Sequence, residues 1–250
     1  MQDNWKKNTT IFMASQAVSI LGSSLVQFAI TWYVTMTTQS GIYATLIIIC
    51  GFLPTFLLSP FAGVWADRYD RKKLIMLSDG GVAACTLILA ILFLMGYDSI
   101  WLLFVASGIR AIGSGIQTPC INAILPELVP YEHLTKINGI NSSLQSLITL
   151  LSPAVAGVML GFASLEMILF VDVITAILAI TIILFFFKLS TKNKEDEAKD
   201  RNIMREMKEG FSYIFKTAYL RNFFLFYALF NILISPGEFL TPLQTTRTFG

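Results

Sequence analysis

Seven apolar stretches, separated by short polar connections, account for most of this 250-residue sequence. An α-helix needs roughly 20 predominantly apolar residues to cross the hydrocarbon core of a bilayer. Strands of a membrane barrel would be about 10 residues of alternating polarity, and these stretches are longer and uniformly apolar. The predicted fold class is therefore all-α, a polytopic membrane helix bundle. The predicted spans lie near residues 10–36, 44–65, 74–96, 99–122, 137–161, 166–187 and 222–246.

Composition excludes an ordinary soluble domain. Apolar residues make up 55% of the chain, charged residues 14%, and the mean hydropathy is +0.67. Soluble domains carry about 25% charged residues. The lipid bilayer is therefore the predicted surrounding of the chain. Its net charge is only +2, and we predict no nucleic-acid partner.

The basic residues occupy alternate connections, which predicts the orientation in the membrane. Lys6 and Lys7 precede the first span, four cations fill the second connection, and a further group lies between residues 188 and 221. The first, third and fifth connections contain no Lys or Arg. Because Lys and Arg accumulate in short cytoplasmic loops, the amino terminus is predicted to be cytoplasmic. The predicted location is the cytoplasmic membrane of the cell.

These features predict three parts. Residues 1–187 form an amino-terminal six-helix transmembrane bundle, and residues 222–250 contain a seventh span that starts a second half. Residues 188–221 form a cytoplasmic linker that begins with mixed charge. Apolar residues then recur at helical spacing from Ile203 to Phe215, which predicts an amphipathic helix at the membrane surface.

The second connection contains the most distinctive motif, Gly-x-x-x-Asp-Arg-x-x-Arg-Lys. Its members are Gly63, Asp67, Arg68, Arg71 and Lys72. A glycine there is expected to let a neighbouring helix approach closely, and the cations anchor the turn at the inner face. A simple topological anchor is the alternative interpretation. The ordered pattern resembles the loop between the second and third helices of the major facilitator superfamily. That resemblance implies a cytoplasmic gate in which Asp67 and Arg71 reach the facing half of a transporter.

Arg110 lies deep within a predicted span, roughly 11 residues or about 16 Å from its outer end. An arginine at this depth costs several kcal/mol unless it faces a polar cavity or a carboxylate. Asp172, Glu238 and Asp79 are three candidate carboxylates for proton coupling. Asp79 lies nearer the cytoplasm, and a role at the gate alone is the alternative for it. Arg110 and Asp172 are within about 8 Å in depth, so their pairing depends on whether their helix faces agree. The resemblance implies that Arg110 takes part in proton transfer; a tie between helices is the alternative.

The fifth span contains Gly139 followed by Ser152, Pro153 and Gly157. This pattern resembles the antiporter motif of the same family, with Ser and Ala in place of two glycines. Small residues are expected to allow close packing, Gly157 with Gly161 in particular, and the proline allows a bend. A plain packing helix would have a similar pattern.

Amide and hydroxyl side chains within the spans are candidates for lining a substrate cavity, or for hydrogen bonds between helices. They are Gln16, Gln27, Thr31, Gln117, Asn141 and Gln145. The cysteines have no metal-binding spacing, so no metal and no cofactor is predicted. An ATP-binding Gly-x-x-x-x-Gly-Lys loop is absent from the sequence, so an ion gradient is the expected energy source.

Phrases along the whole chain resemble the macrolide-efflux-type drug:proton antiporters of this superfamily. They include Trp32-Tyr33-Val, Arg110-Ala-Ile-Gly-Ser-Gly and Phe170-Val-Asp172. The resemblance implies a non-enzymatic, proton-coupled exporter of small amphipathic drugs that works by alternating access. The chain would then be the amino-terminal half and the seventh helix, with the missing carboxy-terminal half as partner. A carrier of another small solute and a non-transporting truncated membrane protein are the alternatives.

Overall fold

The structure is a computed structural model that describes residues 4–186 and 212–249, with side chains over 4–185 and 212–234. Within these ranges the chain forms long helices and no strand, which confirms the all-α prediction. The long helices are α1 (Asn4–Thr38), α2 (Gly41–Arg68), α3 (Arg71–Leu94), α4 (Ile100–Leu128), α5 (Tyr131–Phe162), α6 (Leu165–Phe186) and α8 (Ala218–Phe249).

Among the described residues, six helices, α1 to α6, are long and apolar enough to cross a membrane. Each satisfies its backbone hydrogen bonds internally, as a lipid environment demands. The helices extend beyond the predicted windows: α2, for example, continues to Arg68 and α4 to Leu128. Polar residues at the ends of an apolar window keep the helix going into the interfacial region, so hydropathy underestimates helix length.

The seventh predicted span corresponds to α8, whose apolar part within the described side chains is Ala218–Ile234. This part is shorter than a bilayer-spanning segment, so the seventh span stays a prediction. The division into three parts at residues 187 and 222 also stays a prediction. Most of the amphipathic helix expected between Ile203 and Phe215 lies outside the described residues.

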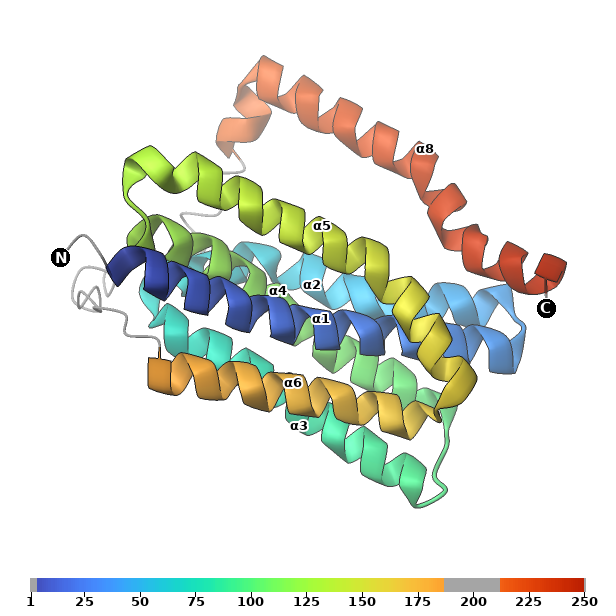
Figure 1. Cartoon of the computed structure of the whole chain (residues 1–250). Helices are drawn as coiled ribbons and strands as arrows, with labels where there is room; N and C mark the ends of the chain where they lie inside the picture. Colours follow the sequence, from blue (N-terminus) through green and yellow to red (C-terminus); the bar gives the residue numbers. More distant parts are fainter. Residues whose placement is uncertain (1–3, 187–211, 250) are drawn as a thin grey trace.

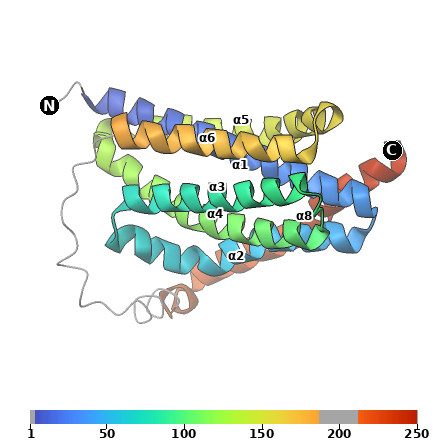
Figure 2. The same cartoon turned by 90° about the horizontal axis from the view of Figure 1, so that it is seen from below.

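The six helices run side by side with their long axes roughly aligned (Figure 1). Helix α1 packs against α5 and α6, α2 packs against α4, and α3 packs against both α4 and α6. Viewed from below, α3 lies between α6 and α4 (Figure 2). Helix α8 lies to one side of this bundle and contacts it only weakly, at α1 and α2. The centre of the bundle is therefore the junction of α1, α3, α4 and α6.

Apolar side chains from these central helices form the core. One cluster includes Val26, Ile30 and Leu169, and a second, nearer the basic end, includes Phe12 and Ile124. In contrast, α2 and α5 present large apolar side chains outward, among them Phe52, Phe56, Leu150 and Val158. Such faces are stable only against lipid or another apolar surface.

Glycines allow two of the central helix contacts. A Cβ atom on Gly22 of α1 would lie 1.9 Å from Thr175 Oγ1 of α6, and one on Gly113 of α4 would lie 2.3 Å from Val82 Cγ2 of α3. These helix pairs can approach as they do only because both positions lack a side chain. Gly113 belongs to the Arg110-Ala-Ile-Gly-Ser-Gly phrase noted in the sequence, but close packing was predicted at neither Gly22 nor Gly113.

No described helix packs closely against the motif glycines. A Cβ atom on Gly63, Gly139, Gly157 or Gly161 would meet no atom within 4 Å. The physical reason is that these glycines lie on faces of α2 and α5 that no other described helix covers. Close packing at these four glycines therefore stays a prediction.

Candidate functional site

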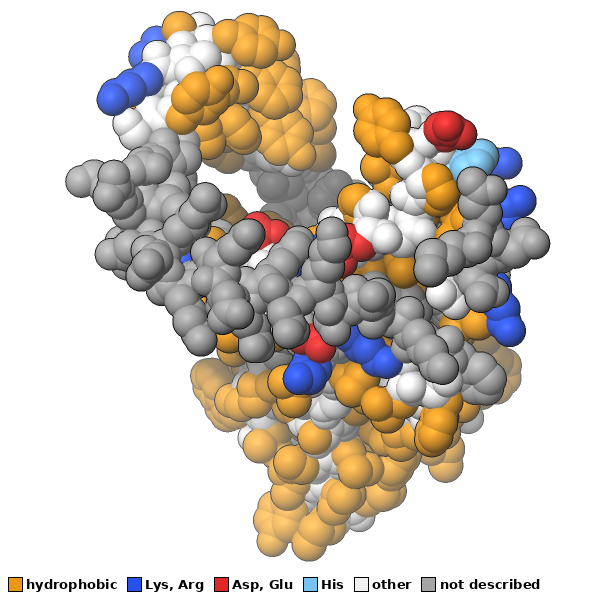
Figure 3. Space-filling model, turned by 90° about the vertical axis from the view of Figure 1, so that its left-hand side faces the viewer, with side chains coloured by type: hydrophobic (Ala, Val, Ile, Leu, Met, Phe, Trp, Pro, Cys, Tyr) orange, Lys and Arg blue, Asp and Glu red, His pale blue; other side chains and the backbone are white. Residues whose placement is uncertain are grey.

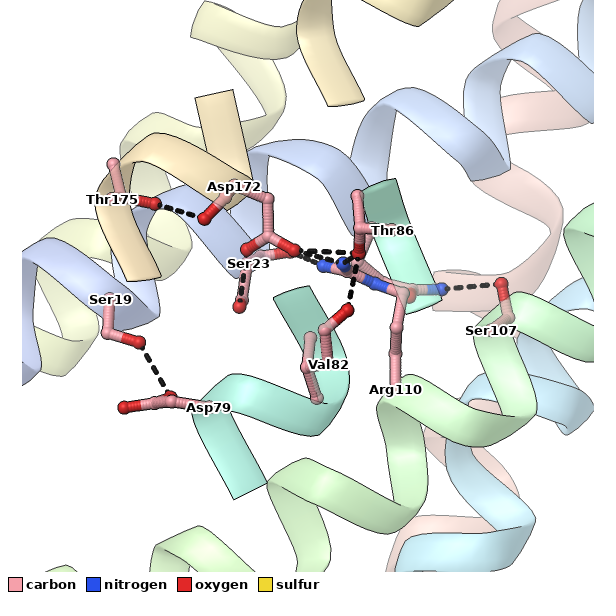
Figure 4. Close-up of polar contacts among 10 residues, drawn as sticks. Ser19, Ser23, Asp79, Val82, Thr86, Ser107, Arg110, Asp172 and Thr175 are labelled. Atoms are coloured by element: carbon pink, nitrogen blue, oxygen red, sulfur yellow. Dashed lines mark hydrogen bonds and ion pairs between the residues drawn. The ribbon is translucent and has the colours of Figure 1, made fainter. Parts of the chain in front are cut away.

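A buried ion pair joins α4 to α6 at the centre of the bundle. Arg110 Nη1 contacts Asp172 Oδ2, and the two side chains are 4% and 1% exposed. Ser23 Oγ of α1 donates to Asp172 Oδ1 over 2.8 Å, and Thr86 Oγ1 of α3 lies 2.9 Å from Asp172 Oδ2. Four helices thus contribute to one polar network (Figure 4). Arg110 and Asp172, whose pairing the sequence left open, face each other directly.

The remaining contacts of Arg110 fix its guanidinium in place. Nη2 donates to the backbone carbonyl of Ser23 over 2.8 Å, and Nη1 lies 2.5 Å from Thr86 Oγ1. Thr86 Oγ1 is also 2.9 Å from the Val82 carbonyl, so its single hydrogen points either there or to Asp172. Arg110 Nε is buried without a hydrogen-bond partner among the described residues.

A cation and two hydroxyl groups surround the carboxylate oxygens of Asp172. Removing one member of a buried ion pair typically costs 3–5 kcal/mol, since the other charge is left uncompensated. Separating Arg110 from Asp172 therefore costs free energy unless a proton or a charged ligand compensates the charge that is left unpaired.

A second polar cluster lies in the same junction, toward the basic end. Asp79 of α3 is 4% exposed. Its Oδ1 accepts hydrogen bonds from Ser19 Oγ of α1 and from Gln117 Nε2 of α4, each over 2.8 Å. Gln117 Nε2 also lies 3.2 Å from Gln16 Oε1. The cluster is linked to α1 and α4 through neutral side chains.

A cavity of about 240 Å³ lies between α1 and α4, with contributions from α2 and α5. Arg110 lines it together with the three amides Gln27, Gln117 and Gln145, so this arginine lies between its carboxylate and the cavity. The other lining residues are Ile20, Ser23, Ser24, Gly51, Ala111, Ser114, Thr118 and Ile121. Small polar, apolar and amide groups together suit an amphipathic ligand, although drug-sized ligands usually occupy about 300–1,000 Å³.

Of the six amide and hydroxyl candidates, Gln27, Gln117 and Gln145 line the cavity and the other three do not. Gln16 is 2% exposed and contacts Gln117 instead. Thr31 Oγ1 donates to the Gln27 carbonyl within α1 over 2.9 Å. Asn141 is half-buried on α5 away from the cavity. Within the described part of the chain, no three His, Cys, Asp or Glu residues are grouped closely enough to hold a metal ion.

Arg71 is the centre of a polar cluster at the basic end of the bundle. Its Nη1 lies 2.8 Å from Glu127 Oε1 and its Nη2 lies 3.2 Å from Asp67 Oδ1. Its Nε donates to the Ala66 carbonyl over 2.6 Å, and Nη1 donates to the Ala123 carbonyl over 2.8 Å. Arg71 thereby connects the ends of α2 and α4. Figure 3 looks onto this end, where basic and acidic side chains lie among apolar ones.

The turn that carries Arg71 is shaped by its neighbours. Asp70 is the N-cap of α3, and its side chain accepts hydrogen bonds from the backbone N–H groups of Lys72, over 2.9 Å, and Lys73, over 3.3 Å. Asp70 therefore satisfies donors that a helix start leaves unpaired. Arg68 is the last residue of α2. The motif position directly before Arg71 thus begins the next helix.

Glu127 was missed in the sequence, although it contacts Arg71 directly. The available signal was a carboxylate directly after Pro126 at the end of the fourth apolar stretch, on the same side as the basic turn. Asp67, in contrast, was predicted to contact a facing half. Its side chain is 76% exposed, so it keeps an open side while it also pairs with Arg71.

The motif on α5 and Glu238 have no described contact with the cavity or with the Arg110–Asp172 pair. Ser152 is buried, and its Oγ donates to the Ile148 carbonyl over 2.6 Å, one turn before Pro153. This is a local bond within α5, and it contacts neither the cavity nor the ion pair. Glu238 lies in α8 beyond the residues whose side chains are described, so its expected role with Arg110 and Asp172 stays a prediction.

The sequence is similar to known families of membrane proteins. Residues 12–250 match the family model described as Major Facilitator Superfamily. The chain is 34% identical over 248 residues to "Macrolide efflux protein A" of Streptococcus pyogenes, an alignment that covers 99% of this chain and 61% of that protein. It is 34% identical over 200 residues to the protein of the same name from Enterococcus faecalis, covering 80% of this chain and 62% of that protein.

A third relative bears a different name. The "Staphyloferrin A transporter" of Staphylococcus aureus is 29% identical over 157 residues, covering 61% of this chain and 39% of that protein. The chain therefore spans about three fifths of the length of the macrolide efflux relatives that it matches.

Proposed function

This chain belongs to the major facilitator superfamily, and on that basis we propose that it forms the amino-terminal part of a proton-coupled exporter of amphipathic drugs. One observation carries the proposal: the buried Arg110–Asp172 pair borders a polar cavity at the centre of the bundle. The names of the relatives at 34% identity support a macrolide-like substrate class. The protein would be a carrier rather than an enzyme, in the cytoplasmic membrane with its amino terminus inside.

The proposed coupling starts from the geometry of the ion pair. A proton that reaches Asp172 neutralises the carboxylate and removes the partner of Arg110. Opening the pair without such compensation would cost about 3–5 kcal/mol. Arg110 already lines the cavity, so its freed guanidinium can then enter the space that a substrate occupies and favour release of the substrate. Release of the proton restores the pair and withdraws the guanidinium. Glu238 is the proposed carboxylate on the other side of the transport path.

Alternating access would be a rocking motion between this bundle and a second half. The uncovered faces of α2 and α5, with Gly63, Gly139 and Gly157 on them, are the proposed contact surface for that half. At the basic end, Asp67 has an exposed side that a partner could cover while Arg71 holds α2 to α4. Covering Asp67 would close the inner side of the path.

A carrier of another small solute is the second candidate. The relative named for staphyloferrin A supports it, because that name indicates a substrate unlike a macrolide. On α5, Ser and Ala replace two glycines of the antiporter motif, so the motif does not determine the direction of transport. The two candidates share the ion-pair mechanism and differ in the ligand that the cavity accepts.

The test is accumulation of labelled macrolides and dyes in cells that express the longest reading frame containing this chain, with the 250-residue chain alone beside it. We expect lower accumulation with the longer form and no difference once a protonophore is added. Arg110→Gln should abolish the effect at equal expression, whereas Lys136→Gln, which changes an exposed cation on α5, should leave it intact. Unchanged accumulation for every compound would contradict drug export and favour the other carrier or a non-transporting protein.

A further inference from the structure

We propose that Asp79 is a second proton-binding group of this bundle and that Gln117 links its protonation to the contents of the cavity. The inference deepens the proposed function and rests on it for the identity of the substrate. It concerns a carboxylate that the ion-pair mechanism does not use. Its support comes from burial, hydrogen bonding and charge around Asp79.

The hydrogen bonds of Asp79 are unevenly distributed over its two oxygens. Both donors, Ser19 Oγ and Gln117 Nε2, bond to Oδ1 at 2.8 Å. Oδ2 is buried and has no hydrogen-bond partner among the described residues. This is the pattern of a neutral carboxyl group, in which Oδ1 is the carbonyl oxygen and Oδ2 carries the hydrogen. Uptake forms the Oδ2–H bond with a proton from water, and release breaks it.

The charged groups around Asp79 also favour a neutral carboxyl group. Helix α6 presents Asp172 toward it, an anion, and α4 carries Arg110, which is already paired with Asp172. Helix α1 presents the uncharged Ser19 and Gln16. The charged residues Asp67 and Arg68 are at the end of α2, and Asp79 lies eight residues, or about 12 Å, along α3 from its first residue Arg71.

Within the described residues no cation pairs with Asp79, in contrast to Asp172. A buried ionised carboxylate without a cation is strongly destabilised, and such a group takes up a proton instead. Asp172 is therefore the carboxylate that is paired with a cation, and Asp79 is the one that takes up a proton. The two acids differ because only one of them faces the arginine.

The two acids are arranged as successive layers of one junction. Asp79 and Thr86 are seven residues apart on α3, as are Arg110 and Gln117 on α4, which is two turns or about 10 Å in each helix. Ser19 and Ser23 are one turn apart on α1. Each layer thus takes one residue from α1, α3 and α4. A proton can be bound at either layer without a rearrangement of the helices.

Gln117 connects the layer that contains Asp79 to the cavity. It lines the cavity and donates to Asp79 Oδ1 through the same side-chain amide. A ligand that reorients this amide changes the stabilisation of the Asp79 anion, so substrate and proton affect each other's affinity by the same factor. Because the proposed exchange needs substrate and proton to alternate, we expect that substrate binding favours proton release.

Infrared spectroscopy of the purified full-length protein tests the protonation directly. We expect a carboxyl C=O band, in the region of protonated acids, that is present at mildly acidic pH, disappears as the pH is raised and is missing from Asp79→Asn. Asp98→Asn, which removes an exposed carboxylate in the turn after α3, is the matched control and should keep the band. A spectrum unchanged by Asp79→Asn would overturn the proposal.

Binding of a radiolabelled macrolide at several pH values tests the link to the cavity. In the wild type the affinity should rise up to tenfold per pH unit over the range where the band titrates, and Asp79→Asn should remove that slope. Gln117→Leu should retain the band and lose the slope. An unchanged slope in either variant overturns the link. If the wild type neither binds nor exports macrolide while the band titrates and requires Asp79, the drug-export function fails and the proton site stands.

Discussion

The Arg110–Asp172 pair permits a quantitative prediction for a double-mutant cycle. Asp172→Asn retains the shape of the side chain but leaves Arg110, which is 3% exposed, without its anion. Arg110→Gln leaves Asp172, which is 1% exposed, without its cation. Each single variant should lose about 3–5 kcal/mol of unfolding free energy, because an uncompensated charge stays buried. This is a factor of roughly 10² to 10⁴ in the folding equilibrium.

The double variant Arg110→Gln/Asp172→Asn should lose about 3 kcal/mol less than the sum of the two, since no uncompensated charge is left at this position. Residues in one ion-pair network typically show coupling of about 0.5–3 kcal/mol, and the full burial here places the expected value near the upper end. Neutral amides can still bond to Ser23 Oγ and Thr86 Oγ1, which contact Asp172 in the wild type.

The assay is equilibrium unfolding of the purified protein in mixed micelles, titrated with a denaturing detergent and followed by helical circular dichroism. Transport is measured in parallel, and all three variants should be inactive because the coupling charge is lost. Losses that add to within about 0.5 kcal/mol would refute a coupled pair and indicate two separately satisfied charges. Stability restored in the double variant without transport would separate the structural role from the functional one.

Two further predictions concern packing and orientation. Gly22→Ala places a methyl group against Thr175 Oγ1 and should cost about 1–3 kcal/mol of unfolding free energy, because it forces α1 away from α6. The control is Gly157→Ala, which has no described atom within 4 Å of the added methyl group and should be neutral or slightly stabilising. Equal losses in the two variants would contradict the packing argument. The orientation can be tested with a membrane-impermeant thiol reagent in a cysteine-free background. Tyr69→Cys should react only in inverted vesicles and Tyr97→Cys only in intact cells, because these exposed residues lie in turns at opposite ends of α3. The reverse labelling would overturn the prediction of a cytoplasmic amino terminus.

The helices were predictable because apolar length is a strong local signal, but their ends were not. Arg68 and Leu128 extend α2 and α4 beyond the apolar windows, since helix continuation at an interface depends on capping rather than on hydropathy. Arg110 and Asp172 could each be identified from the cost of a charge in lipid. Their contact could not, because a residue's depth can be counted along a helix whereas its facing depends on how α4 and α6 rotate against each other.

Other parts of the site depend on information that a single sequence does not contain. Glu127 lies at a helix end, where charged residues are common, so its place on the same side as the basic turn did not single it out as the partner of Arg71. Close helix contacts were expected at Gly157 and occur instead at Gly22 and Gly113. A glycine is tightly packed only if another helix covers its face, and that is a property of the assembled bundle.

The order of α4 and α6 along the chain has a consequence for how the protein is made. Asp172 follows Arg110 by 62 residues, so at about 5–20 residues per second the arginine is synthesised roughly 3–12 s before its anion. Helix α4 is also the least hydrophobic of the six spans, with a mean hydropathy of 1.4, whereas α6 has the highest value, 2.8. Until α6 arrives, α4 must be retained by the Ser23 carbonyl and the Thr86 hydroxyl of helices already inserted. The insertion of α6 then neutralises the arginine, which makes the last helix of the bundle the one that locks the fourth into the bilayer.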